Sequence, residues 1–365
     1  MELQKYLDLL VAKDGSDLFF TAGAPAHIKV EGVTSPIGEA PFKPDAVKAL
    51  AYSVLDEGQI QKFEQTLELD TAYSVYNVGR FRINVFFQRG QVAMVIRYIR
   101  WEIPGIETLQ LNSSLKNMIM DKRGLILIAG SSGSGKSTTM ASMIDYRNRH
   151  KTGHILTLED PIEFIHTHKK SVVNQREVGI DTLTYDAGLR HAVRESPDVI
   201  LLGEIRDEET MKHAMSYATT GHLCISTIHA ANTVQALERI TNFFPDAARK
   251  QILMDLSLSL RAVVSQRLVV NQHDNKLLPT LEILQNSAGI RKTIREGNLH
   301  TVKEALTKAS GTGQLSFEDD LIRLIKENKI TLEEAMANAD LPDNVKLSIK
   351  LGGSGISSAR DDIFS

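Results

Sequence analysis

Apolar positions near the start of the chain recur at helical spacing. Leu3, Leu7 and Leu10 would share one face of an amphipathic helix. Short strand-like pieces follow, broken by Gly and Pro, and then a second helical stretch. We expect strands over residues 17–21 and 27–30, and a helix around residues 45–55.

Between residues 79 and 99 the pattern changes to alternation. Phe81 and Ile83 would point to one face of a strand, while Arg80 and Arg82 would point to the other. Arg89-Gly90 fits a two-residue turn, so residues 91–99 are expected to return as a second strand. Residues 1–100 are therefore predicted to form a small α+β domain.

After a predicted linker over residues 101–114, the hydrophobic pattern changes to short continuous apolar runs. A parallel sheet buried on both faces requires runs of this kind. The runs are Leu125–Ala129, Ile155–Leu158, Val199–Leu202 and Leu223–Thr227. Helical patterns separate them, a helical region is expected over Phe317–Ala339, and the tail from Gly352 is expected to be flexible. Residues 115–365 therefore predict an α/β domain.

Gly130–Ser137 fits the phosphate-binding pattern G-x-x-x-x-G-K-[ST]. An apolar run precedes the pattern and a helix-compatible run follows it, which is the context the motif requires and which disfavours a ligand-free Gly/Ser loop. Backbone N–H groups and a helix N-terminus would surround the phosphates of ATP. Lys136 would reach the β- and γ-phosphates, and Ser137 would bind Mg²⁺. The expected nucleotide contacts are Ser132, Gly133, Ser134, Gly135, Lys136, Ser137 and Thr138.

Acidic residues and histidines stand at the ends of the other apolar runs. In open α/β sheets, ligands bind beyond the carboxyl ends of the strands. Glu163 and Glu204 are candidates to orient the attacking water or to hold Mg²⁺ together with the P-loop serine, although each could simply cap a helix. His229 is a candidate catalytic residue and His222 a candidate nucleotide contact, although lone histidines are often structural. Gly203 stands where many P-loop enzymes place a metal-binding Asp.

Two arginines are expected to face each other in the N-terminal hairpin. If Arg89-Gly90 is the turn, Arg82 lies directly opposite Arg97. Like charges in this arrangement are destabilising, and an anion between them would remove the penalty. The two side chains are therefore candidate arginine fingers that reach a neighbouring subunit's nucleotide. The alternatives are that both point into water, or that a different turn shifts the register.

Composition narrows the choice of partners and compartment. The 365 residues contain 42% hydrophobic and 24% charged residues, and the formal net charge is −3. A strongly basic nucleic-acid binder is not indicated. Cys224 is the single cysteine, which excludes an intrachain disulfide and a multi-cysteine zinc site and fits a reducing compartment. No run reaches about 18 apolar residues, so we expect a cytoplasmic protein without direct membrane insertion.

The ordered motifs resemble the secretion ATPase superfamily, and in particular the type IV pilus retraction ATPases of the PilT/PilU family. The matching segments are Gly130–Ser137, Thr157–Glu163, Ser196–Asp207 and Thr220–Ala230. The resemblance implies a PAS-like N-terminal domain, a RecA-like C-terminal ATPase domain, ATP and Mg²⁺ as cofactors, and a homo-hexameric ring. Arg82 and Arg97 match the family's arginine-bearing strands.

Within this family the chain resembles the PilU group more than the PilT group. The segments that carry this resemblance are Gly221–Cys224, Ala236–Ile240, Phe243–Pro245, Met254–Leu258 and Ile349–Gly352. The Ala-Ile-Arg motif of PilT appears here as Gly289-Ile290-Arg291. The resemblance implies an accessory to a PilT-type sister ATPase, held at the inner membrane by the pilus platform protein. The alternatives are an assembly or secretion ATPase, which usually carries a Cys₄ zinc module, and a nucleic-acid translocase, which the near-neutral charge disfavours.

Overall fold

The N-terminal segment with alternating apolar residues and the C-terminal segment with continuous apolar runs form two separate sheets. The computed structural model describes residues 2–76, 78–99, 101–308 and 313–351. The chain divides into a first unit, residues 1–102 with 162–165, and a second unit, residues 103–161 with 166–365. Residues 103–114, which the sequence analysis treated as a linker, group with the second unit, where Ile106 and Leu111 are buried. The tail expected to be flexible from Gly352 lies outside the described residues.

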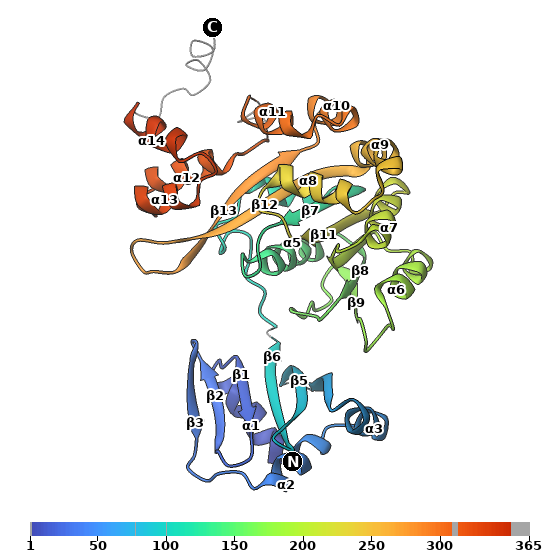
Figure 1. Ribbon diagram of the computed structural model, residues 1–365, viewed down its shortest axis with the longest axis vertical. Coiled ribbons are helices and arrows are strands. Elements are labelled where there is room, and N and C mark those ends of the chain that lie inside the picture. Colours follow the sequence, from blue (N-terminus) through green and yellow to red (C-terminus); the bar gives the residue numbers. More distant parts are fainter. Residues whose placement is uncertain (1, 77, 100, 309–312, 352–365) are drawn as a thin grey trace. The chain divides into compact units, whose positions relative to one another are not determined.

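The first unit contains a six-stranded antiparallel sheet among its described residues, in the order β3-β2-β1-β6-β5-β4. Its strands are β1 (Asp17–Phe20), β2 (Ala26–Val30), β3 (Val33–Ile37), β4 (Glu68–Val75), β5 (Gly79–Gln88) and β6 (Gln91–Ile99). Its helices are α1 (Glu2–Ala12), α2 (Pro44–Tyr52) and α3 (Glu57–Thr66) (Figure 1). The N-terminal helix and the strand pair over residues 79–99 are confirmed.

The β5–β6 hairpin follows directly from its sequence. Arg89 and Gly90 have φ values of 50° and 73°, which is the pair of positive angles that a tight hairpin turn requires. The alternating side chains Phe81, Ile83 and Val85 are fully buried in the core of this unit. Strands β3 and β4 and helix α3 were not predicted. The first four residues of β3 are exposed, so this strand lacks the buried alternation that marks a core strand.

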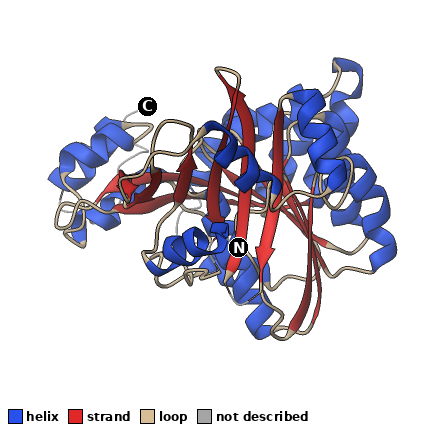
Figure 2. Cartoon of the chain, turned by 90° about the horizontal axis from the view of Figure 1, so that it is seen from below, coloured by secondary structure: helices blue, strands red, loops and turns tan. Residues whose placement is uncertain are grey.

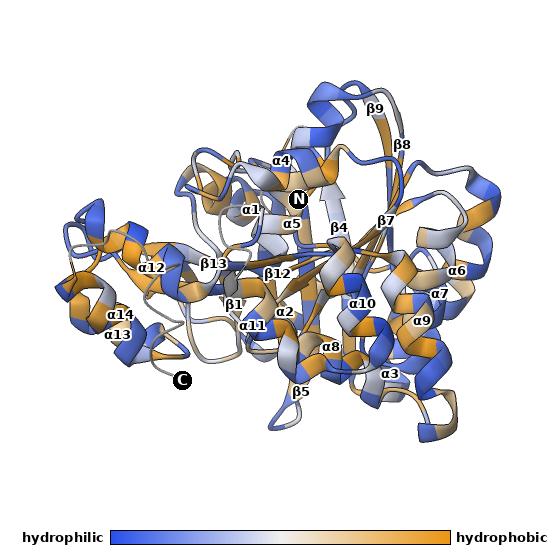
Figure 3. Ribbon diagram, turned by 90° about the horizontal axis from the view of Figure 1, so that it is seen from above, coloured by the Kyte–Doolittle hydropathy of each residue, from blue (hydrophilic) through white to orange (hydrophobic). Residues whose placement is uncertain are grey.

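The second unit contains a seven-stranded sheet in the order β13-β12-β7-β11-β10-β8-β9. All neighbours in this sheet are parallel except β13, which runs antiparallel to β12. The strands are β7 (Gly124–Ala129), β8 (Gly153–Glu159), β9 (Ser171–Glu177), β10 (Val199–Glu204), β11 (Leu223–Ile228), β12 (Leu260–Val270) and β13 (Leu277–Gln285). The four apolar runs are confirmed as buried parallel strands, and Figure 3 shows apolar colour along the sheet.

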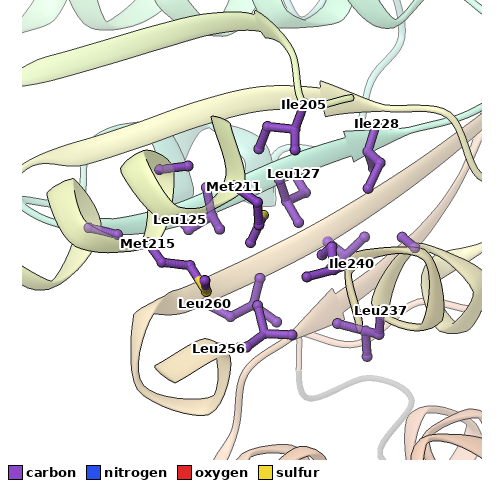
Figure 4. Packing of buried hydrophobic residues seen from close by; sticks show 14 of the residues in the cluster. Leu125, Leu127, Ile205, Met211, Met215, Ile228, Leu237, Ile240, Leu256 and Leu260 are labelled. Atoms are coloured by element: carbon purple, nitrogen blue, oxygen red, sulfur yellow. The ribbon is translucent and has the colours of Figure 1, made fainter. Parts of the chain in front are cut away.

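Helices cover both faces of this sheet (Figure 2). One face packs against α4 (Ser114–Ile119) and α5 (Lys136–His150). The other face packs against α6 (Tyr185–Ala192), α7 (Glu208–Thr219), α8 (Thr233–Asn242), α9 (Arg249–Ser259), α10 (Ala288–Glu296) and α11 (Val302–Lys308). Figure 4 shows Leu125 and Leu127 of β7 beside Met211 of α7, and Leu256 of α9 beside Leu260 of β12. Short 3₁₀ turns occur at Val193–Glu195, Asp246–Ala248 and Leu299–Thr301.

The C-terminal helices form a smaller cluster beside the β12–β13 hairpin (Figure 1). They are α12 (Phe317–Lys326), α13 (Leu332–Asn338) and α14 (Pro342–Lys350). The single helical region expected over residues 317–339 is two helices, because the side chain of Thr331 caps the N-terminus of α13 and begins a new helix there.

Candidate nucleotide site

The loop between β7 and α5 has the geometry of an anion cradle. Gly135 has a φ of 85°, a left-handed conformation that glycine adopts without strain, and α5 begins at the next residue. Ser137 and Thr138 then occupy the first turn of α5, where free backbone N–H groups and the helix dipole attract anions. The predicted strand, loop and helix are therefore all present in the order that the motif requires.

The side chains in this loop fit phosphate groups. The Nζ of Lys136 is nearly buried and donates hydrogen bonds to the carbonyl oxygens of Gly130, at 3.0 Å, and Ser131, at 2.7 Å. The buried Oγ of Ser134 has no hydrogen-bond partner among the described residues. The unsatisfied buried hydroxyl of Ser134 is a group that a phosphate oxygen would satisfy, and the positive charge of Lys136 would attract the phosphate.

A cavity of about 300 Å³ adjoins this loop. On one side it is lined by Ser131, Ser132, Gly133 and Ser134, and on the other by Ala231, Gln266, Arg267, Leu268 and Asn338. The second group comes from the segment after β11, from β12 and from the end of α13. Sequence reasoning assigned no function to that second group, because these residues carry no recognisable motif.

Glu204 and His229 lie together at the carboxyl edge of the sheet, the edge from which the phosphate-binding loop also leaves. Glu204 ends β10, and its Oε1 lies 3.2 Å from Nε2 of His229, the residue after β11 ends. Its Oε2 accepts a hydrogen bond of 2.8 Å from Nε of Arg206. Both carboxylate oxygens are therefore held. Arg206 was not predicted, and the only sequence signal for it is its place two residues after the acid.

A β-bulge at Gly203 changes the direction of the Glu204 side chain relative to the regular strand. Leu202 faces Ser226 and Glu204 faces Thr227, so Gly203 is one extra residue on β10. A Cβ atom at position 203 would lie only 2.9 Å from the hydroxyl oxygen of Tyr185. The metal-binding Asp of many P-loop enzymes would therefore require the Tyr185 hydroxyl to shift. Burial, reinforced by nearby acidic groups, raises the pKa of Tyr185, which keeps this phenol neutral.

The other acidic candidate, Glu163, stands in the loop that follows β8. Glu163 is exposed, and its segment, residues 162–165, belongs by its contacts to the first unit. The carboxylate that the structure buries near the end of β8 is Glu159, which accepts hydrogen bonds from Thr157 Oγ1 at 2.7 Å and Gln175 Nε2 at 3.2 Å. Glu204 is thus joined by His229, and a role for Glu163 stays a prediction.

The structure does not bring His222 to the phosphate-binding loop of its own subunit. His222 precedes β11, whereas His229 follows it, and the strand between them is six residues long. At about 3.3 Å per residue, the seven steps from His222 to His229 span roughly 23 Å. Because β11 runs parallel to β7, His222 lies at the edge of the sheet opposite the phosphate-binding loop. Its ring Nδ1 lies 3.3 Å from the carbonyl oxygen of Tyr217.

The predicted pairing of Arg82 with Arg97 is confirmed, but the argument for an anion between them is wrong. The two residues are direct cross-strand partners. However, Arg82 makes an ion pair of 3.2 Å with Asp70, and Arg97 makes one of 2.8 Å with the buried Asp17. These carboxylates offset the repulsion between the arginines within the chain, so no further anion is required.

Comparison with known proteins places this geometry in a family. The family described as "Type II/IV secretion system protein" matches residues 81–312. The chain belongs to this family, among its PilT/PilU-type ATPases. It is 44% identical to the type IV pilus ATPase PilU of Pseudomonas aeruginosa, over 96% of this chain and 92% of that protein. It is 37% identical to the retraction ATPase PilT of the same organism, over 94% of this chain and 100% of that protein.

A solved structure agrees with these relatives. The crystal structure of the pilus retraction motor PilT with bound ADP superimposes with a TM-score of 0.87 at 39% identity, covering 95% of this chain and 98% of that one. The protein is therefore a nucleotide-binding ATPase with a PilT-like α/β fold. Within the described residues, no helix is long and apolar enough to cross a membrane.

Proposed function

We propose that this protein is an ATP-hydrolysing motor that powers or assists retraction of type IV pili, as a PilU-type accessory to a PilT-type sister ATPase. The observation that carries the proposal is the similarity to PilU along nearly the whole chain, which includes both units and not only the P-loop. Similarity confined to the nucleotide site would support hydrolysis but not this cellular role.

The site residues support distinct roles in ATP hydrolysis. Lys136 and the loop N–H groups would hold the β- and γ-phosphates. Ser137 and Glu204 offer the oxygen ligands that Mg²⁺ prefers, and the bound ion would neutralise charge on the phosphates. Glu204 would orient the attacking water, with His229 and Arg206 fixing the direction of its carboxylate.

The architecture of each unit supports a finer assignment. In the second unit, β11 separates the P-loop strand β7 from the strand β10 that carries Glu204. We assign the part of this unit from residue 115 onward as a RecA-like domain, and residues 1–100 as a PAS-like domain. Glu163 keeps a proposed role near the nucleotide, which its place in the loop after β8 supports.

Purified protein tests the catalytic assignment. Glu204→Gln and Lys136→Ala are expected to lower ATP turnover at least about 100-fold, because general-base and phosphate contacts are lost. Glu333→Gln, an exposed carboxylate on α13, is the matched control and should keep wild-type turnover. Full turnover by Glu204→Gln would overturn the assignment.

Experiments in cells distinguish a retraction motor from an assembly or secretion ATPase. A strain that carries Glu204→Gln should lose twitching motility or twitching force while keeping surface pili, because extension does not need a retraction motor. Loss of surface pili would instead favour an assembly ATPase. Affinity purification should recover a PilT-type ATPase or the inner-membrane platform protein, and recovery of nucleic acid alone would contradict the proposal.

We further propose that the protein works as a homo-hexamer in which Arg82 and Arg97 reach a neighbour's nucleotide. Measuring the ATP turnover of a mixture of two inactive variants tests this arrangement directly. Arg97→Ala supplies an intact P-loop and Lys136→Ala supplies an intact arginine, so a mixture should recover turnover that neither variant shows alone. Arg89→Ala, at the exposed turn of the same hairpin, is the matched control and should remain active. Full activity of Arg97→Ala by itself would refute the role.

A further inference from the structure

The phosphate-binding loop is held from the side by a residue far away in the chain. Gln266 lies on β12, the strand next to β7. The register pairs Ser265 with Ala129, the last residue of β7. Gln266 therefore lies level with Gly130, where the loop begins, although 136 positions separate the two residues in the sequence (266 − 130).

The amide of Gln266 uses both of its ends on the loop and the helix that follows it. Its Oε1 accepts a hydrogen bond of 2.6 Å from the hydroxyl of Thr139, in the first turns of α5. Its Nε2 donates one of 2.8 Å to the carbonyl oxygen of Ser134. Both bonds are buried, and Gln266 is only 3% exposed. The side chain thus ties the end of the loop to the start of α5.

The bond to Ser134 sets the direction of a backbone donor. In a trans peptide unit the C=O and N–H groups point to opposite sides. Because the carbonyl of Ser134 points towards Gln266, the N–H of Gly135 in the same peptide unit points away from β12. Backbone N–H groups are the donors with which such loops bind phosphate, so their direction decides whether the cradle is formed.

The fit between Gln266 and the loop is close. A Cβ atom at Gly135 would lie 2.8 Å from Nε2 of Gln266, so a larger residue would displace the amide. Thr139 is also linked to Gly135 through the backbone, since its N–H donates to the Gly135 carbonyl at 3.0 Å. The amide, the glycine and the threonine therefore constrain one another.

We propose that Gln266 is a positioning residue that holds the phosphate-binding loop in the conformation that receives the phosphates of the nucleotide. The proposal rests on the nucleotide-binding role of the P-loop. It adds that the neighbouring strand β12, and not the loop sequence alone, determines the affinity of the loop for the phosphates of the nucleotide. Gln266 acts through the loop and not by contact with the reacting atoms.

Nucleotides that differ by one phosphate test the proposal. Gln266→Met keeps an unbranched side chain of similar length and removes both hydrogen bonds. We expect its dissociation constant for ADP to rise about tenfold or more, while that for AMP changes less than about twofold. Thr139→Val removes one of the two bonds and should weaken ADP binding by about threefold. Calorimetric titration with ADP and AMP supplies both constants.

Gln314→Met is the matched control. Gln314 is also buried, and it also makes two amide hydrogen bonds of 2.8 Å, to the backbone of Gln285. This variant should bind ADP as the wild type does. Unchanged ADP affinity in Gln266→Met, or equal weakening of ADP and AMP, would overturn the positioning role. Failure of the wild-type protein to bind ADP would instead contradict the proposed function itself.

Discussion

Asp340 provides a quantitative test of how the C-terminal helices are attached. It lies between α13 and α14 and pairs with Arg267 of β12 and with Lys303 of α11, the latter at 2.8 Å. The side-chain amide of Asn232, at the N-terminus of α8, donates to the same carboxylate at 3.1 Å. One carboxylate therefore joins three elements that are distant in the sequence. We expect Asp340→Asn to loosen all three junctions together.

The structure bounds the size of this effect. Removing one partner of a fully buried ion pair costs about 3–5 kcal/mol. The side chains of Asp340, Arg267 and Lys303 are 15%, 21% and 31% exposed, so water can partly replace the lost partner. We therefore expect a loss of about 3 kcal/mol, near the lower end of that range. For a unit of this size each kcal/mol corresponds to about 2–4 °C, which gives a decrease in Tm of roughly 6–12 °C.

Differential scanning calorimetry without nucleotide measures this change. Asp255→Asn on α9 is the control, because it makes the same change of charge at a partly exposed carboxylate that accepts a hydrogen bond of 2.8 Å from the neutral side-chain amide of Gln251. The control should shift Tm by less than about 2 °C, as expected for a substitution at a partly exposed site without an ion pair. Equal, small shifts in the two variants would refute the reasoning that Asp340 anchors the C-terminal helices.

Three further outcomes are expected. Burial alone would raise the pKa of Asp340, but hydrogen bonds from Lys303 and Arg267 outweigh burial and hold that pKa below its ordinary value of 3.8. The Tm difference between wild type and Asp340→Asn should therefore be complete near pH 7 and disappear as the pH falls below about 4, as calorimetry across pH would show. Burial raises the pKa of Cys224 to about 12, so a thiol reagent at pH 8 should label it only after denaturation. Gly203→Ala should lower stability by about 1–2 kcal/mol through its clash with the Tyr185 hydroxyl, and adding Tyr185→Phe should recover part of that loss in urea unfolding.

Much of the fold could be predicted because its signals are local. Four apolar runs indicated buried parallel strands, and these are β7, β8, β10 and β11. Alternation around Arg89-Gly90 predicted the hairpin and its register down to the pair of Arg82 and Arg97. Side chains on a strand alternate by geometry, so a pattern of two residues carries this information without any knowledge of the rest of the chain.

The elements that were missed differ in the strength of their local patterns. Strand β3 is mostly exposed, whereas β12 and β13 contain several buried apolar residues that were not assigned to strands from the sequence. Helix α3 did carry a signal, since Asp56 and Gln59 form a capping box at its start. Attention to that spacing would have found it.

The candidate site divides in the same way. The spacing of Gly130–Ser137 determined a phosphate loop, and the acid and histidine after β10 and β11 were found from strand ends alone. The two ends of β11 could not be distinguished by type of residue, so His222 was placed with His229 although a whole strand separates them. The carboxylates that pair with Arg82 and Arg97 come from β4 and β1, beyond the reach of hairpin reasoning.

The sequence by itself determined which segments are strands, which loop binds phosphate and which family the motifs resemble, because each of these depends on residues within one short stretch. Only the tertiary structure decided which side chains contact each other across long distances in the sequence. Gln266 meets Thr139 across 127 positions, and Arg97 meets Asp17 across 80. Such contacts follow from strand order and register, which are set by the packing of the whole sheet. No pattern in a single segment records them.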